Sequence, residues 1–281
     1  MENGQLSIIT YTESSFKDNV QTLISTFKSH FASAGINLDV QICSYQPDQD
    51  EFGRIHRGKF LLDSVISYVL FSKTHQSFKK KALSLFYSSG EWSKLLFRGS
   101  SNLGVRETPE YMRRDQFLTD KHLRAIFSFL ESEKIFLIIA SDDVIRKQDS
   151  INELVEESIE ILKIHENKPV YIELAEYFEA SSLMHQFGLK IYDVPPKLSN
   201  WQRFDFFCNT GACYIINRHF AKQIASTITL KPWLRVCSID WLLTYISRVP
   251  NHLGPVYYFS RKKPLLENYS LESGNSDLVN E

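Results

Sequence analysis

The stretch EKIFLIIASDDVI, residues 133–145, sets the fold class. Its central run, 135–141, carries no charge and is rich in Ile, Leu and Phe, which predicts a buried strand. Asp142 and Asp143 follow directly. Two neighbouring carboxylates repel one another, and burial makes each costlier to ionise. A divalent cation would remove that cost, as would a turn that points both side chains into water or a role as cap of the next helix.

Strand and helix patterns alternate around this stretch, which predicts an α/β protein with a mostly parallel central sheet flanked by helices. The predicted strands are 6–11, 36–45, 135–141, 170–174 and 255–260, and 209–217 is predicted as a turn that leads into a strand. The predicted helices are 15–34, 58–71, 118–131, 150–166, 218–227 and 238–248. The polar stretch 98–114 has little periodicity and is interpreted as a long loop. We expect one domain over residues 1–268 and a flexible tail over 269–281.

The composition is that of a globular protein and gives no sign of nucleic acid as a partner. The chain has 281 residues, 43% of them hydrophobic and 23% charged, with a formal net charge of -1. The first residues lack the pattern of a signal peptide, and no stretch reaches the roughly 18 apolar residues of a membrane span. The four cysteines show no metal-ligand spacing. These features predict a cytoplasmic protein.

Four segments together resemble glycosyltransferase family 25, the lipooligosaccharide-biosynthesis and collagen-galactosyltransferase type. They are FLTDKHLRAIFSFLESEKIFLIIASDDVI (117–145), NTGACYIINRHFAKQI (209–224), SIDWLL (238–243) and NSDL (275–278). The family has a hydrophobic strand that ends in a Glu-Asp-Asp-Val-like motif. Ser141 stands here in place of the glutamate.

The resemblance implies a GT-A fold, with a nucleotide-binding part at about 1–145 and an acceptor-binding part at about 146–268. It also implies a nucleotide-sugar donor such as a UDP-sugar, with Mn²⁺ or Mg²⁺ bridging its diphosphate. The acceptor would be a saccharide or glycolipid of surface-polysaccharide or lipooligosaccharide synthesis. An enzyme with such an acceptor would work at the inner face of the membrane, with peripheral contact to it.

Under this mapping Asp142 and Asp143 are the metal-binding pair. Transfer with inversion needs a base near the acceptor hydroxyl, and Asp240 at the start of a helix is the candidate. Its position is equally typical of a carboxylate favoured by the helix dipole. Glu173, near the end of another predicted strand, is the alternative base.

The remaining candidates are small, basic or imidazole side chains in predicted turns and loops. We expect the turn residues to approach the donor sugar, the histidine to be a third metal ligand and the basic run to hold the diphosphate. An ordinary turn, a surface histidine and a solvated charge run explain the same residues without function. The turn residues are Asn209, Thr210 and Gly211, the histidine is His252, and the basic run is Arg261, Lys262 and Lys263.

Two other functions fit the same aspartates. A phosphate-ester hydrolase or nucleotidyltransferase would use them for the same cation, although no phosphatase or P-loop motif is present in the sequence. A non-catalytic nucleotide- or sugar-binding module of the same fold would bind ligand without turnover. The serine at position 141, where the family has a glutamate, keeps this second alternative open.

Overall fold

The structure is a computed structural model. It describes residues 3–10, 17–43, 109–146, 151–175, 191–205, 211–236, 239–248, 257–262 and 265–268. The calls on Asn209, Thr210, His252, Lys263, the helix at 58–71 and the tail at 269–281 lie outside these residues.

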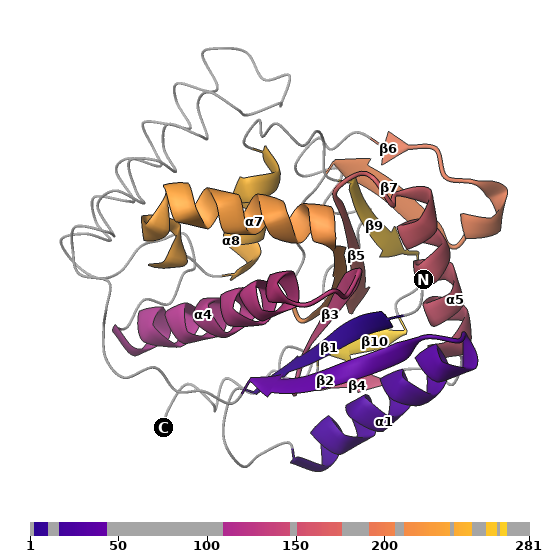
Figure 1. The fold of residues 1–281 in the computed structure, drawn as a ribbon, viewed down its shortest axis with the longest axis horizontal. Helices are drawn as coiled ribbons and strands as arrows, with labels where there is room; N and C mark the ends of the chain where they lie inside the picture. The colour runs from indigo at the N-terminus through magenta and orange to yellow at the C-terminus, as the bar shows by residue number, and fades with distance from the viewer. Residues whose placement is uncertain are drawn as a thin grey trace.

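The described strands form one sheet, with helices on both of its faces (Figure 1). The strands are β1 (Asn3–Ile9), β2 (Asn37–Cys43), β3 (Phe136–Ser141), β4 (Val144–Arg146), β5 (Val170–Ala175), β6 (Ile191–Tyr192), β7 (Trp201–Asp205), β8 (Cys213–Asn217), β9 (Tyr257–Arg261) and β10 (Leu266–Asn268). The helices are α1 (Lys17–Ser33), α4 (Pro109–Glu131), α5 (Ile151–Ile164), α7 (Arg218–Leu230) and α8 (Ile239–Arg248), with short 3-10 turns η1 (Pro196–Leu198) and η2 (Pro232–Val236).

The sheet is mixed, so the expectation of a mostly parallel sheet was wrong. Its main path runs β2-β1-β3-β8-β5-β9-β7-β6, and β10 pairs with β4 and β5. The first three strands are parallel, but β8 is antiparallel to both β3 and β5, and β7 is antiparallel to β9 and β6. A strand buried on both faces has the same apolar pattern in either direction, so the sequence of β8 did not reveal its orientation.

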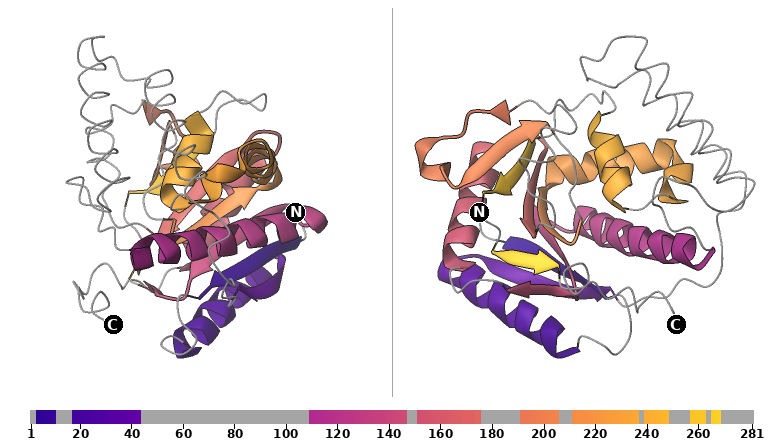
Figure 2. Two further views of the ribbon diagram at one scale, coloured as in Figure 1. Left: turned by 90° about the vertical axis from the view of Figure 1, so that its left-hand side faces the viewer. Right: turned by 180° about the vertical axis from the view of Figure 1, so that it is seen from behind.

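Two apolar layers hold the helices on the sheet. Alternate residues of β3 face opposite sides: Phe136 and Ile138 pack with α1 and α5, whereas Leu137 and Ile139 pack with α4, α7 and α8. Figures 1 and 2 show the two groups of helices on opposite sides of the sheet. Each fully buried large side chain contributes about 1.5–3 kcal/mol relative to exposure, which makes these layers the main source of stability.

Two polar residues at the junction of β8 and α7 join the helix ends to the sheet. The Asn217 side chain accepts hydrogen bonds from the backbone N–H groups of Val170 and Phe220, and donates to the carbonyls of His165 and Lys168. The next residue, Arg218, donates to four carbonyls at the end of α4. These belong to Phe129, Leu130, Ser132 and Lys134. The helix ends, which leave backbone groups unpaired, are therefore satisfied by side chains.

Several boundaries differ from the sequence prediction. Helix α4 begins at Pro109, inside the predicted loop 98–114, since proline is favoured in the first turn of a helix and its missing N–H costs nothing there. Strands β4, β6, β7 and β10 were not predicted, because they are short or irregular and are stabilised by pairing rather than by their own pattern.

Candidate site at the carboxyl end of the central strand

Asp142 and Asp143 form a turn directly after β3, between the end of β1 and the start of β8. The backbone N–H of Asp142 donates to the Ile9 carbonyl at 2.9 Å, and that of Ser141 donates to the Ala212 carbonyl at 2.7 Å. Both aspartates are buried, with 1% and 2% of their surface exposed. The alternative in which the turn points both into water is therefore wrong.

The helix-cap alternative for these aspartates is also wrong. Strand β4 follows the turn and pairs with β10, and the next helix, α5, begins only at Ile151. The turn is instead held from α1, where the Asn19 side-chain amide donates to the carbonyls of Asp142 at 2.6 Å and Val144 at 2.9 Å. The backbone around the two carboxylates is thus fixed by three separate elements.

A lysine from α4 supplies positive charge next to the turn. Lys121 is only 5% exposed and donates from Nζ to the carbonyl of Thr10, just after β1. Burial lowers the pKa of Lys121, while the nearby charge of Asp142 opposes that shift. The lysine therefore lies within electrostatic reach of the aspartate, at the carboxyl ends of the parallel strands, where ligands bind in α/β sheets.

A cavity of about 490 Å³ opens beside Lys121, between the end of β2 and one face of α4. Cys43 of β2 lines it, and burial raises the pKa of this thiol. Lys121 and Arg124 give the cavity basic groups, and Ile42 and Phe127 give it apolar ones. Glu131 adds a carboxylate to the same lining, so the charge of the cavity is mixed.

A row of stacked rings crosses the α4 side of the sheet next to Glu173. Tyr171 lies between Tyr214, at 4.9 Å between ring centroids, and Tyr258, at 5.6 Å. The hydroxyl of Tyr171 donates to Glu173 Oε2 at 2.8 Å. His122 stacks on Tyr214 and is joined to its hydroxyl by a 2.8 Å hydrogen bond. Glu173 is 1% exposed, so this candidate base is oriented by a tyrosine inside the protein.

His122 is held neutral. Burial, assisted by the charge of Lys121, lowers the pKa of its imidazole from 6.5 to about 3. An imidazolium in this position would lose its hydration without gaining a carboxylate, which explains the direction of the shift.

The other described candidates are dispersed around the sheet. Gly211 has a φ of 62°, a left-handed conformation that favours glycine, and it lies one residue before Ala212, which contacts the Asp142 turn. Asp240 lies in the first turn of α8, in the layer of α4 and α7. Lys262 is exposed, and its backbone N–H donates to the carbonyl of Asn200.

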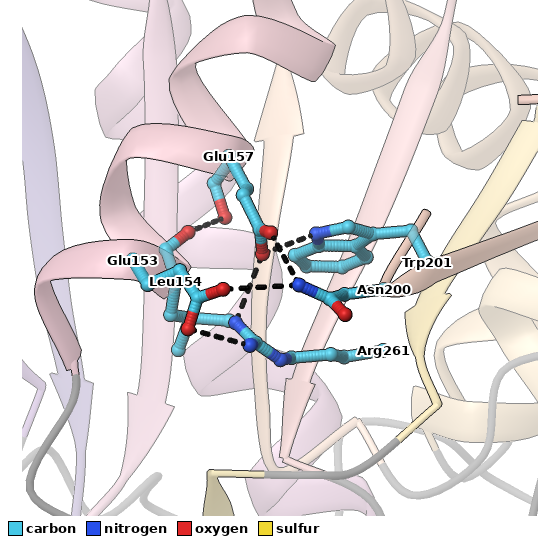
Figure 3. A network of polar contacts seen from close by, with 7 residues as sticks. Glu153, Leu154, Glu157, Asn200, Trp201 and Arg261 are labelled. Atoms are coloured by element: carbon cyan, nitrogen blue, oxygen red, sulfur yellow. Dashed lines mark hydrogen bonds and ion pairs between the residues drawn. The ribbon is translucent and has the colours of Figure 1, made fainter. Parts of the chain in front are cut away.

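Arg261 takes part in an ion-pair network instead of projecting from a basic run (Figure 3). Its guanidinium contacts Glu157 and Glu153 of α5, each at 2.9 Å. Glu157 also accepts from the indole N–H of Trp201 at 2.7 Å and, through its other oxygen, from the side chain of Asn200. The network joins α5 to β7 and β9, which gives Arg261 a structural role in this arrangement.

The sequence interpretation missed Lys121, Asn19 and Tyr171. Lys121 has a signal: it falls on the apolar face of its helix, where a charged residue is unusual. Nothing local marks Asn19, whose partner in the turn is 123 residues away in the sequence.

Among the described residues, no group of three or more His, Cys, Asp or Glu side chains is placed to hold a metal ion. In that same part of the chain, none of the helices combines the length and the apolar character needed to cross a membrane.

Comparisons with known proteins give no family. No protein-family model matches the chain, and no curated protein matches it. Among solved structures, the chain is similar to the one described as the crystal structure of A197 from STIV. The two share 10% identity over 95% of this chain and 83% of the other, with a TM-score of 0.36.

Proposed function

We propose that this protein is a metal-dependent glycosyltransferase with a GT-A arrangement, which transfers a sugar from a nucleotide-sugar donor to a saccharide or glycolipid acceptor. The observation that carries the proposal is the buried Asp142–Asp143 turn at the carboxyl end of β3. The single sheet, which joins strands from the nucleotide-binding and acceptor-binding parts expected from the sequence, supports the GT-A arrangement.

The turn suits Mn²⁺ or Mg²⁺ held jointly by protein and substrate. Asp142 and Asp143 would supply carboxylate oxygens to such an ion, and phosphate and water oxygens are its usual further ligands. A bound cation would offset the negative charge that the leaving diphosphate gains. Lys121 of α4 donates to the Thr10 carbonyl just after β1 and lies within electrostatic reach of Asp142, so it would supply a second positive charge to the same group.

The acceptor hydroxyl needs a proton acceptor. In the proposed step, the oxygen of the acceptor forms a bond to the anomeric carbon as the bond from that carbon to the diphosphate breaks. The hydroxyl proton passes to a carboxylate, for which Asp240 is the first candidate and Glu173 the second. A carboxylate in either place acts as base only where substrate reaches within hydrogen-bond distance.

The second candidate function is a non-catalytic nucleotide- or sugar-binding module. Ser141 keeps it open, because the family resemblance expects a glutamate there. The Ser141 side chain is buried, and its hydroxyl oxygen has no hydrogen-bond partner among the described residues. A module would bind the donor with metal and would release no nucleoside diphosphate.

The proposal is tested by thermal melting with UDP, UDP-sugars and other nucleotide sugars, each with Mn²⁺ and with chelator. A ligand that binds only the folded state raises the melting temperature. We expect a metal-dependent rise with one donor class, lost in Asp142→Asn and Asp143→Asn. The matched control is Asp39→Asn, whose carboxylate is 59% exposed and pairs with Lys134 at the surface. A rise that survives both turn variants, or no rise with any nucleotide, contradicts the proposal.

Turnover separates the enzyme from the module. Release of nucleoside diphosphate is followed with the stabilising donor and a panel of saccharide acceptors, for the wild type, Asp240→Asn and Glu173→Gln. We expect one of the two variants to lose roughly 10²–10⁴-fold in rate, the usual contribution of general base catalysis, while its donor-induced melting shift persists. Donor binding without turnover in the wild type supports the module.

A further inference from the structure

The opposite end of the sheet carries an arginine held between two tyrosine rings. Arg203 of β7 has its guanidinium carbon 4.9 Å from the ring centroid of Tyr257 and 5.2 Å from that of Tyr192. The two rings lie nearly perpendicular, with centroids 5.3 Å apart. Cation–π contacts on two rings fix the plane of the guanidinium.

Arg203 differs in its partners from Arg218 and Arg261, two other half-buried arginines. Arg218 donates to four carbonyls and Arg261 pairs with two glutamates. Within the described part of the chain, no hydrogen bond or ion pair involves the Arg203 side chain, and its Nε is buried without an acceptor. Burying a charged donor without an acceptor costs free energy, and an acceptor group from a ligand would remove that cost.

His165, just after α5, completes this corner. It is 5% exposed, and its ring lies 5.5 Å from that of Tyr257 and 5.2 Å from that of Phe259. Its Nδ1 is also buried without a hydrogen-bond partner in the regions that the structure describes. Burial, followed by the charges of Arg203 and the exposed Lys168, lowers the pKa of His165 to about 4. Both charges that act on the His165 imidazole in this way are positive.

We propose that Arg203, fixed by Tyr192 and Tyr257 and adjoined by His165, forms a binding site for an oxyanion, the phosphate or carboxylate group of a ligand. A guanidinium presents parallel N–H donors that match both groups, and a fixed plane lowers the entropic cost of binding. The registers of β5 with β8 and β9 place Tyr257 at the end of the sheet opposite the Asp142 turn. The site is therefore separate from the proposed donor site and does not depend on the glycosyltransferase proposal.

A purely structural role for Arg203 has a different consequence. Its charge lies near the end of α5, where the helix dipole is negative, and would stabilise the helix by a modest amount. In that role the arginine contributes to stability, but the protein gains nothing specific from added anions.

The test is an NMR titration of the wild-type protein with sodium phosphate and, separately, sodium acetate, at constant ionic strength maintained with sodium chloride. The side-chain Nε–Hε signal of Arg203 is assigned by its absence in Arg203→Gln. Melting temperatures are recorded in parallel for the wild type, Arg203→Gln, Arg203→Lys and Lys197→Gln. Lys197→Gln is the matched control, since it removes one positive charge from an exposed side chain paired with Glu160 of α5.

We expect a saturable shift of the Arg203 signal with phosphate or acetate. The salt that causes the shift shows whether the site binds a phosphate or a carboxylate group. Phosphate stabilises many proteins by exclusion from their surface, so the expected melting result is the difference between variants. The saturable rise in melting temperature should be retained in Lys197→Gln. In Arg203→Gln the apparent affinity for the anion should fall roughly tenfold. Arg203→Lys should lie between them, because lysine lacks the planar fork. An Arg203 signal that does not move with either salt overturns the proposal, even if the variants fold poorly.

Discussion

The two ends of the sheet bury polar side chains in different ways. At the amino end, the Asn217 amide and the Arg218 guanidinium form hydrogen bonds with backbone groups. At the carboxyl end, Asp142 and Asp143 are buried side by side with like charge, close to one lysine. The first arrangement stabilises the fold through hydrogen bonds, whereas the second places two like charges in the interior, where burial makes each costlier to ionise.

The largest effect that would test this comparison is at the amino end. Asn217→Ala removes four hydrogen bonds and the cap of α7, and leaves buried backbone groups without partners. We expect the free energy of unfolding to fall by about 3–5 kcal/mol, measured by urea denaturation. Asn37→Ala, at an exposed position, should change it by less than about 0.5 kcal/mol.

Asn217→Asp separates the contribution of the hydrogen bonds that Asn217 accepts from that of the bonds it donates. The aspartate keeps an acceptor for the Val170 and Phe220 N–H groups but loses the donors to His165 and Lys168. We expect a loss at least as large as half that of the alanine variant. Equal stability of the aspartate variant and the wild type would show that the carbonyl contacts are unimportant.

The second effect concerns pH and the buried His122. Between pH 6.5 and about 3, the unfolded chain binds a proton at this residue and the folded protein does not. Stability therefore falls as the pH falls through this window, and the loss levels off below about 3. His122→Gln removes this contribution, on the order of a few kcal/mol, so the difference in unfolding free energy from the wild type should change with pH only in that window. A constant difference from pH 7 to 4 would contradict the assignment.

The third effect tests the carboxyl end. Lys121→Gln removes the positive charge beside Asp142, and we expect the affinity for UDP with Mn²⁺ to fall roughly tenfold, about 1.4 kcal/mol, by calorimetry. Lys28→Gln removes an exposed lysine and should leave the affinity unchanged. If both variants bind like the wild type, the lysine serves only the Thr10 carbonyl.

An effect of similar size is expected at a matched pair of glycines with positive φ. Gly35→Ala, at φ 76° with no atom within 4 Å of the added Cβ, should cost about 1–2 kcal/mol from the backbone alone. Gly211→Ala, at φ 62°, carries the same backbone cost in a buried turn beside the candidate site, so its loss should be at least as large. Thermal melting compares the two. A smaller loss at Gly211 would show that this turn adjusts more readily than the end of α1.

The sequence by itself determined the elements whose patterns are local. The apolar run 135–141 forms β3, the alternation of strands and helices gives an α/β protein, and the two aspartates mark the end of the central strand. Each depends on neighbouring residues alone, so periodicity and composition are sufficient.

Only the tertiary structure decided the direction of β8 and the surroundings of the aspartates. Strand β8 is buried on both faces, so its sequence is equally compatible with either direction, and its pairing with β3 and β5 sets the orientation. Asp142 meets Lys121 of α4 and Asn19 of α1 because the sheet brings the ends of separate elements together. Burial and long-range partners arise from packing between segments that are distant in the sequence, and this packing decides which charges the two aspartates meet.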